Sequence, residues 1–267
     1  MIIEPSQISA QLLNSPMALH PGYFPAAMAV DARSFDEPAY GEIAYGIVGG
    51  IAVIPVLGVL LQSLGTTFSW GDATGYDGIR FNFLHALENP DVEAIVLHVA
   101  SGGGAVAGCF DLADLIYDSR GKKPIAAICA EHAYSAAYAL ASAADVIFVP
   151  RTGGTGSIGI ITAHIDVSKA LDKAGIKVTF ITYGEQKADG NPEIPLTDEA
   201  LKAIQDDVDK MGELFCETVA RNRNLPVEKV RGMQAGTFLG AAGIKAGLAD
   251  VIAAPDEAFK TLLAELG

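Results

Sequence analysis

Ser135 is the first candidate for chemistry in this sequence. It follows an apolar run that ends at Tyr134 and precedes an alanine-rich stretch, so we expect it where a strand ends and a helix begins. In that position the hydroxyl would lie near the positive end of a helix dipole, and the small neighbours leave room for a substrate. A serine at a helix start is more commonly an N-cap. Two interpretations of Ser135 therefore stand, a nucleophile and a cap.

A serine hydroxyl needs a base before it can act as a nucleophile, and two kinds of base are present. His132 lies close to Ser135 in the sequence, but no acidic residue is placed by pattern to orient its ring, which favours a structural histidine. Lys187 follows an apolar run, on a segment rich in turn residues. A free lysine has a pKa of about 10.4, so it needs burial among apolar groups to accept a proton near neutral pH. Taken alone, Lys187 is more simply a solvated loop lysine.

A run of glycines at residues 101–104 (SGGG) follows another apolar stretch and precedes a helical pattern. Backbone N–H groups without side chains in the way would suit a developing oxyanion. The run matches neither G-x-G-x-x-G nor a glycine turn ending in Gly-Lys-Ser/Thr, so we expect no phosphate-bearing cofactor there. The simpler interpretation is a tight turn between a strand and a helix.

The elements that would position these residues alternate along the chain. The predicted helices cover residues 75–88, 105–118 and 197–222. The predicted strands cover residues 51–56, 94–99, 125–130, 146–149, 159–164 and 177–182. Strands that are apolar on both faces and separated by helices indicate a mainly parallel sheet covered on both sides. The sequence therefore predicts an α/β fold.

The longest predicted helix, residues 197–222, has Thr197 as a plausible N-cap and carries one continuous apolar stripe. The stripe consists of Leu201, Ile204, Val208, Met211 and Phe215. Packing of the helix on its own domain explains such a stripe, and a contact between subunits is a further possibility.

Composition excludes several classes of protein. The chain has 267 residues, a formal net charge of −14 and 50% hydrophobic residues, which excludes intrinsic disorder. The acidic balance argues against nucleic-acid binding and against adsorption to anionic lipid. The three cysteines, Cys109, Cys129 and Cys216, lie far apart in apolar runs. They predict reduced core thiols in a reducing, cytoplasm-like compartment, with no metal site.

One long stretch, residues 44–71, has no charged side chain and is long enough to raise the possibility of a membrane span. It contains Pro55 and several glycines, which favours a buried strand running into an apolar loop. The N-terminus lacks a basic segment followed by an unbroken apolar run, so we expect no secretory leader and no membrane anchor.

Taken together, these stretches resemble the signal peptide peptidase A-like serine peptidases, which include the capsid-maturation proteases of tailed phages. The resemblance covers roughly residues 45–255. The SGGG run at 101–104 looks like the oxyanion turn of that family, and YSAAY at 134–138 looks like its nucleophile helix. TGSIG at 155–159, the segment Gly184-x-x-Lys187 and AGLAD at 246–250 match further signatures in the same order. The sequence departs from the family where Ala136-Ala137 replaces Gly-Gly and where Ser101 replaces a frequent proline.

The resemblance implies a dyad of Ser135 and Lys187 that cleaves peptide bonds through an acyl-enzyme. The N–H groups of Gly102 or Gly103 and of Ala136 would hold the oxyanion. Two supporting roles are also implied: Ser157 would orient Lys187, and Tyr134 with the apolar loop 56–64 would line the substrate channel.

At the level of the whole chain, the resemblance implies the Clp protease/crotonase-like fold, with a mainly parallel sheet flanked by helices. It also implies a homo-oligomer, no cofactor, and a dyad that could be completed across subunits. Residues 1–40 would form a phage-type N-terminal arm, and residues 41–267 a single Ser-Lys peptidase domain. The substrates would be scaffold or capsid proteins in the host cytoplasm or prohead, or those of a soluble signal-peptide-peptidase-like protease.

Two other functions remain open. A crotonase-like acyl-CoA enzyme would also need paired oxyanion N–H groups, but it usually has paired carboxylates, and Glu131 is the only acid in the nucleophile stretch. A catalytically inactive assembly ring is the other alternative, and the Ala136-Ala137 pair is the only hint of it.

Overall fold

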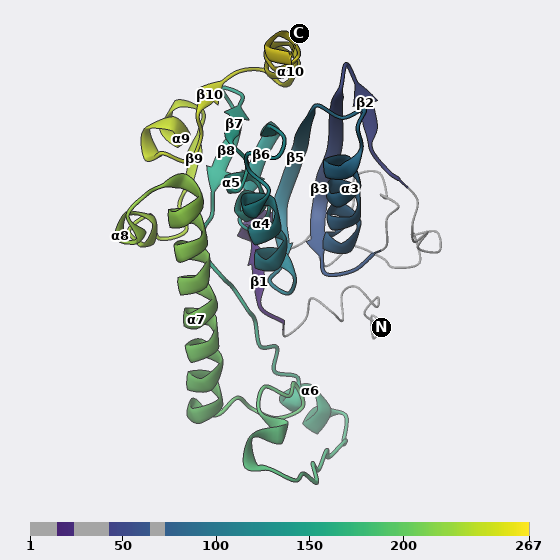
Figure 1. The fold of residues 1–267 in the computed structure, drawn as a ribbon. Coiled ribbons are helices and arrows are strands. Elements are labelled where there is room, and N and C mark those ends of the chain that lie inside the picture. The colour runs from purple at the N-terminus through teal and green to yellow at the C-terminus, as the bar shows by residue number, and fades with distance from the viewer. Residues whose placement is uncertain (1–14, 24–42, 65–72, 267) are drawn as a thin grey trace.

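The computed structural model describes residues 15–23, 43–64 and 73–266. These residues form one ten-stranded sheet whose central path runs in the order β10-β7-β6-β5-β3-β2 (Figure 1). The strands are β1 (Met17–Leu19), β2 (Gly46–Val48), β3 (Ile51–Leu61), β4 (Ala73–Gly75), β5 (Ala94–Ala105), β6 (Ile125–Tyr134), β7 (Val146–Val149), β8 (Gly154–Gly156), β9 (Thr237–Leu239) and β10 (Val251–Ile252).

Helices connect the strands. They are α3 (Tyr76–Glu88), α4 (Cys109–Asp118), α5 (Ala136–Ser142), α6 (Ser168–Lys173), α7 (Asp198–Arg223), α8 (Val227–Arg231), α9 (Ala241–Ala246) and α10 (Pro255–Leu266), with short 3₁₀ helices at Pro21–Tyr23 and Glu185–Ala188. Strands β3, β5, β6, β7 and β10 pair in parallel, and β1, β2 and β9 pair antiparallel at the margins. The predicted α/β fold with a mainly parallel sheet is confirmed.

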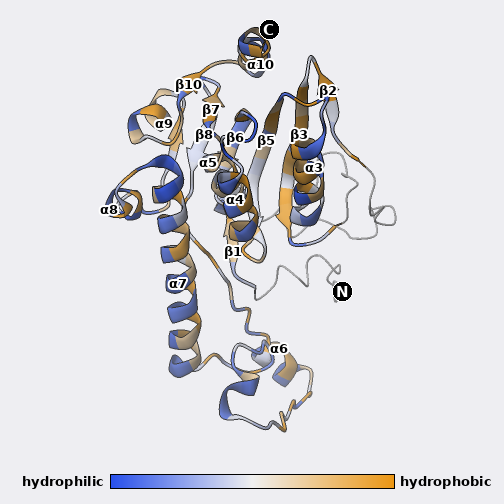
Figure 2. Cartoon of the chain, in the orientation of Figure 1, coloured by the Kyte–Doolittle hydropathy of each residue, from blue (hydrophilic) through white to orange (hydrophobic). Residues whose placement is uncertain are grey.

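The two faces of the sheet bury alternate residues of the same strands. On β5, Ile95, Leu97 and Val99 belong to the large core that also includes side chains of α3, α4 and α5. Ala94 and Val96 point to the other face, where α10 covers them. In Figure 2 the central strands are largely orange, as expected for strands with no solvated face. Because both faces of these strands are buried, the C-terminal ends of β5 and β6 are held in place next to each other.

Several predicted elements match the structure closely. Strand β7 covers the predicted residues 146–149, and α7 begins one residue after Thr197, whose hydroxyl accepts the N–H of Ala200 at 3.1 Å. The predicted apolar loop at 56–64 is wrong for residues 56–61, because β3 continues to Leu61 and pairs with β4 and β5. Residues 65–72 lie outside the described residues.

Two predicted strands do not form. Residues 159–164 contribute only an isolated bridge between Ile161 and Met17, and residues 177–182 are irregular. Both runs lie between β8 and α7, in a segment that extends away from the sheet together with the first half of α7 (Figure 1). Ile181 is 96% exposed, and within the described parts of the chain this apolar run pairs with no strand. Among the described residues, no helix combines the length and apolar character needed to cross a membrane.

Candidate active site

Ser135 occupies the junction between β6 and α5 in a strained conformation. Its φ of 54° and ψ of −123° are rarely adopted by a residue with a side chain, at a typical cost of about 1–3 kcal/mol. Ser135 occupies the N-cap position of α5, but its hydroxyl makes no capping bond, so capping does not account for the side chain. Of the buried side-chain polar atoms in the described residues, Ser135 Oγ alone has no hydrogen-bond partner. Such an atom needs a functional explanation.

The surrounding backbone holds this conformation in place. Tyr134 pairs in parallel with Gly156 of β8, and the Ser135 N–H donates to the Gly156 carbonyl at 2.8 Å. Every residue of α5 is buried. Beyond the end of α5, the Arg120 guanidinium donates to the Ala143 and Ala144 carbonyls at 2.9 and 2.7 Å. The serine is therefore positioned by two strands and a buried helix.

The glycine run does not form the predicted turn. Residues 101–104 continue β5, which ends only at Ala105, so the turn interpretation is wrong. Gly103 has a φ of 104°, and a Cβ added there would overlap the Ala18 carbonyl oxygen. The same added atom would lie 2.9 Å from Ser135 Cβ and 3.0 Å from the Ala136 nitrogen. Gly103, Ser135 and Ala136 thus lie close together, the proximity that the family resemblance implies.

The oxyanion donors differ in what they now bind. Ala136 is the first residue of α5, so its N–H has no acceptor within the helix. The Gly103 N–H donates to Ser101 Oγ at 3.1 Å, and Ser101 donates in turn to the Gly58 carbonyl at 2.6 Å. Gly102 lies under the Tyr23 ring, which an added Cβ would overlap. Ser101, which stands where the family often has a proline, therefore accepts the hydrogen bond of one predicted oxyanion donor, the Gly103 N–H.

Aromatic rings cover this end of β6. His132 and His20 both stack on Tyr134, with ring centroids 5.1 and 4.9 Å away. The Tyr23 hydroxyl hydrogen-bonds His132 Nε2. Burial lowers the pKa of His132 and raises the pKa values of Tyr23 and Tyr134. His132 is thus held by ring contacts and a tyrosine, as expected of a structural histidine.

Lys187 lies apart from this cluster. It is exposed on the 3₁₀ helix Glu185–Ala188, beside a hollow of about 610 Å³ that residues 183–187 line. Within the described part of the chain, no hydrogen bond joins Lys187 to Ser135, whose Oγ has no partner at all. Ser157 is buried and directly follows Gly156, the residue that pairs with Tyr134. It therefore lies beside Ser135 on the β8 side of β6, whereas the glycine run of β5 lies on the other side. The chain by itself therefore brings Ser157, but not Lys187, to the serine.

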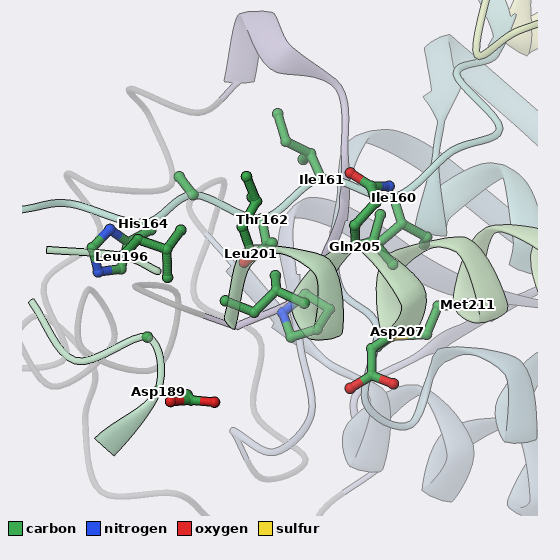
Figure 3. A pocket seen from close by; sticks show the side chains of 15 residues that line it. Ile160, Ile161, Thr162, His164, Asp189, Leu196, Leu201, Gln205, Asp207 and Met211 are labelled. Carbon is green, nitrogen blue, oxygen red and sulfur yellow. The ribbon is translucent and has the colours of Figure 1, made fainter. Parts of the chain in front are cut away.

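A separate hollow of about 570 Å³ lies between α7 and the chain at residues 160–164. Figure 3 shows α7, with Leu201 and Met211, running alongside the segment that carries Ile160 to Thr162. Of the predicted apolar stripe on α7, Phe215 is fully buried, whereas Leu201 is 52% exposed. Packing on the domain therefore explains only the C-terminal end of that stripe.

The remaining motifs are structural. The Asp250 carboxylate of the AGLAD motif accepts the Ile147 N–H at 2.8 Å and pairs with Arg223. All three cysteines are free and buried, as predicted, and burial raises the pKa values of Cys109 and Cys129 to about 12. In the part of the chain that is described, no group of three or more His, Cys, Asp or Glu side chains is placed to hold a metal ion.

Known proteins match this chain over most of its length. The model of Peptidase family S49 matches residues 118–267. Head-tail preconnector protein GP5 of Enterobacteria phage P21 is 34% identical over 98% of this chain and 58% of its own length. The chain belongs to Peptidase family S49. The predicted resemblance is thereby confirmed at the level of the family.

Other proteins similar to this chain come from a phage and a bacterium. Capsid assembly protease C of Escherichia phage lambda is 36% identical over 88% of this chain and 54% of its own length. A putative signal peptide peptidase SppA of Enterococcus faecium is 29% identical over 69% of this chain and 55% of its own length. The chain thus spans a little more than half the length of these relatives.

Solved structures with a similar fold include a ClpP1 mutant from Listeria monocytogenes and an enoyl-CoA hydratase/isomerase family member. The ClpP1 structure is 12% identical with a TM-score of 0.46, covering 75% of this chain and 90% of its own. The second is 15% identical with a TM-score of 0.46, covering 86% of this chain and 76% of its own. At these scores they add nothing to the description of the site.

The sequence interpretation missed two parts of this neighbourhood. The first is β1, whose residues Met17 to Leu19 lie against the glycine run. The second is Ser101, which binds the Gly103 N–H. Alternation of large and small apolar residues in β1 is a signal for a buried strand, but three residues are too few to be recognised by periodicity.

Proposed function

We propose that this chain is a serine endopeptidase in which Ser135 is the nucleophile and Lys187 of a neighbouring copy is the general base. One observation carries the proposal: a buried, strained serine hydroxyl has no partner and lies beside Gly103 and Ala136. Positive φ and an orphaned hydroxyl both cost stability, which is typical of residues retained for catalysis.

The proposed reaction is acyl transfer to serine and then to water. Ser135 Oγ attacks the peptide carbonyl carbon, and its proton passes to Lys187 Nζ and on to the leaving amine. Water then attacks the acyl-enzyme by the same route in reverse. The Ala136 N–H would hold the oxyanion together with Gly103 or Gly102, once the Gly103 N–H exchanges Ser101 Oγ for the substrate oxygen. Ser157, adjacent to the nucleophile, would accept a hydrogen bond from Lys187.

The second copy is needed because the base is exposed in the single chain. A lysine works as a base near neutral pH only when apolar surroundings disfavour its charge. The segment that carries Lys187 also exposes large apolar side chains, which are Ile165, Ile176, Phe180, Ile181 and Tyr183. Together with Leu201 on α7, they favour a homo-oligomer in which this segment packs on another copy.

The substrate and setting follow from the relatives. We propose that the chain cleaves a scaffold or capsid protein during phage head maturation, in the host cytoplasm or prohead and without a cofactor. The names of the phage P21 and lambda relatives support this, since they refer to a head-tail preconnector and to capsid assembly. Residues 1–40 would be the arm of a single peptidase domain at 41–267.

The test combines a serine-directed fluorophosphonate with cleavage of the capsid or scaffold protein. Ser135→Ala is expected to abolish both labelling and cleavage, and Lys187→Ala to reduce each at least about a thousandfold. Ser142→Ala and Lys177→Ala are the matched controls, since one is a buried serine of α5 and the other a lysine of the same protruding segment. Undiminished cleavage by a folded Ser135→Ala chain would refute the proposal.

A further inference from the structure

Strand β1 lies in an unusual place beside the nucleophile. On one edge, β5 pairs with β3 as far as Gly104. On the other edge it pairs with β6, but only as far as Ser101, because β6 ends there and turns at Ser135 into α5. Residues 103–105 of β5 would therefore have a free edge on this side. Met17–Leu19 pair with that edge, antiparallel.

The segment is held on both sides, as a bound peptide would be. Toward β5, the His20 N–H donates to the Gly102 carbonyl at 2.8 Å, and Leu19 pairs with Gly103. On the far side, Met17 and Ile161 exchange two backbone hydrogen bonds, each of 2.8 Å. Backbone pairing to an exposed sheet edge, with pockets for alternate side chains, is a recurring mode of peptide recognition.

The side chains of β1 fill the space between these edges. Met17 and Leu19 are 1% and 3% exposed and pack on Val59 and Leu61 of β3 and on Ala73 of β4. Ala18 is fully buried. Its carbonyl oxygen lies against the position that a Cβ on Gly103 would take, and Ser135 Cβ and the Ala136 nitrogen lie against the same position. A residue larger than alanine would have to displace the chain around the nucleophile.

The groove continues past the start of β1. Pro16 lines the hollow of about 570 Å³ beside α7, and it also lines a second hollow of about 560 Å³ next to residues 105–107. Met211 of α7 lines both. Space is thus available for a polypeptide longer than β1, or for one that follows a different course beyond Pro16.

We infer that residues 16–20 occupy the substrate groove of this peptidase in the isolated chain, so that they must leave before a substrate can pair with β5. The groove they fill selects a strand with a small residue between two large apolar ones. This inference rests on the proposed function, because it treats Ser135 as the nucleophile that the groove serves. Beyond the proposed function, it assigns residues 16–20 of the same chain as the occupant of the groove, and the groove opens when they leave.

The test uses a fluorescein-labelled peptide with the sequence of residues 15–23, SPMALHPGY, and anisotropy as the readout. The peptide is titrated into the full chain carrying Ser135→Ala, alone or with Leu19→Asp, which places a charge in the apolar groove and loosens β1. We expect at least about tenfold tighter binding with Leu19→Asp, since the fraction of open grooves rises. Ile47→Asp, an exposed position on the edge strand β2, is the control and is expected to change nothing.

Specificity has its own arm. A peptide with tryptophan at the position of Ala18 is expected to bind at least about tenfold more weakly, because that position has no free space. Equal, weak binding of SPMALHPGY to all three chains, with Leu19→Asp folded by circular dichroism, would overturn the inference.

A second measurement covers the case in which Leu19→Asp fails to fold. Ser15→Cys in the otherwise unaltered chain is labelled with an environment-sensitive dye. Labelling is selective because all three native cysteines are buried, which raises the pKa of Cys216 and raises those of Cys109 and Cys129 to about 12. Excess SPMALHPGY should shift the emission of the dye by displacing β1, and the tryptophan peptide should not. No shift with either peptide would overturn the inference.

Cleavage assays separate this inference from the proposed function. If Ser135-dependent cleavage is present but equally fast with and without Leu19→Asp, the inference fails and the proposed function stands. If Leu19→Asp strengthens peptide binding but no variant with Ser135 intact cleaves protein, the proposed function fails and the occupied groove stands.

Discussion

At the scale of single residues, Ser135 combines a strained backbone conformation with a hydroxyl that has no hydrogen-bond partner. Ser142, the last residue of α5, is equally buried, but it donates to the Ala139 carbonyl at 2.7 Å and accepts from Asn222 at 2.9 Å. The two buried serines therefore differ in whether the hydroxyl has hydrogen-bond partners. Only at Ser135 is removal of the side chain expected to raise the stability of the protein.

Replacing Ser135 with glycine is therefore expected to stabilise the protein. Ser135→Gly relieves a positive φ and removes an unpartnered hydroxyl, so the free energy of unfolding should rise by about 1 kcal/mol while labelling by fluorophosphonate is lost. Ser142→Ala should lower it by about 1–2 kcal/mol, because the side-chain N–H of Asn222 loses its acceptor. Urea unfolding measures both. A marked loss of stability in Ser135→Gly would mean that the serine has a structural role.

Gly103 is constrained by both its conformation and its neighbours. Gly103→Ala should lower the free energy of unfolding by at least about 2 kcal/mol and abolish cleavage, since the new Cβ meets Ala18 and Ser135. Gly121 is the matched control, with a φ of 80° and no atom within 4 Å of an added Cβ. Gly121→Ala should cost only about 1 kcal/mol, for its backbone strain. Equal losses in the two variants would show that crowding at Gly103 is unimportant.

The family resemblance, more than spacing alone, indicated which residues of this site belong together. It implied related roles for Gly103, Ser135 and Ser157, and the structure places these residues near one another at the ends of neighbouring strands. The bond from the Gly103 N–H to Ser101 Oγ could not be expected, because it depends on a bulge where β5 and β3 change register. The assignments of Ser135, Lys187 and the oxyanion donors as catalytic groups stay predictions.

At the scale of elements, buried strands and capped helices were the predictable part. Strand β7 and helix α7 have signals within their own residues, a short apolar run and a threonine cap. The prediction failed at residues 159–164 and 177–182, where apolar β-branched runs indicate burial but not the identity of the neighbour. In the single chain Val178 and Ile181 stay exposed. A local pattern cannot distinguish a core strand from a surface awaiting another chain.

Strands β5 and β6 each carry a histidine that burial disfavours in its charged form. Burial lowers the pKa values of His98 and His132; for His132, Glu131 opposes the shift and His20 adds to it. The unfolded chain therefore binds protons at a higher pH than the folded one, and stability falls as the pH drops below the unfolded value of about 6.5. The melting temperature should be lower at pH 5.5 than at pH 7.5.

The double variant His98→Gln with His132→Gln tests whether these two histidines cause the pH dependence of the melting temperature. Its melting temperature should depend less steeply on pH over the same range, since neither position then titrates. The aromatic groups facing His132, Tyr23 and Tyr134, stay neutral throughout, because burial raises their pKa values. A double variant as steep as the unaltered chain would place the pH dependence elsewhere in the molecule.

At the scale of the whole molecule, the proposed site is incomplete in the single chain. Ser135, the proposed nucleophile, is buried, the N–H of Gly103, a proposed oxyanion donor, is bound to Ser101, and Lys187 is exposed on a protruding segment. The net charge of −14 makes copies repel one another, so assembly should strengthen with salt, which screens that repulsion. Activity that requires assembly would confine proteolysis to places where the chain is concentrated.

The most direct test of the shared dyad combines two inactive chains. Ser135→Ala and Lys187→Ala are co-expressed with different tags, and assemblies that carry both tags are purified. An intact Ser135 then meets an intact Lys187 only across a subunit contact. We therefore expect recovery of about one half of the unaltered activity for a dimer, falling to about one quarter for a large ring. Mixed assemblies that cleave nothing, while unaltered assemblies prepared in the same way are active, would contradict it.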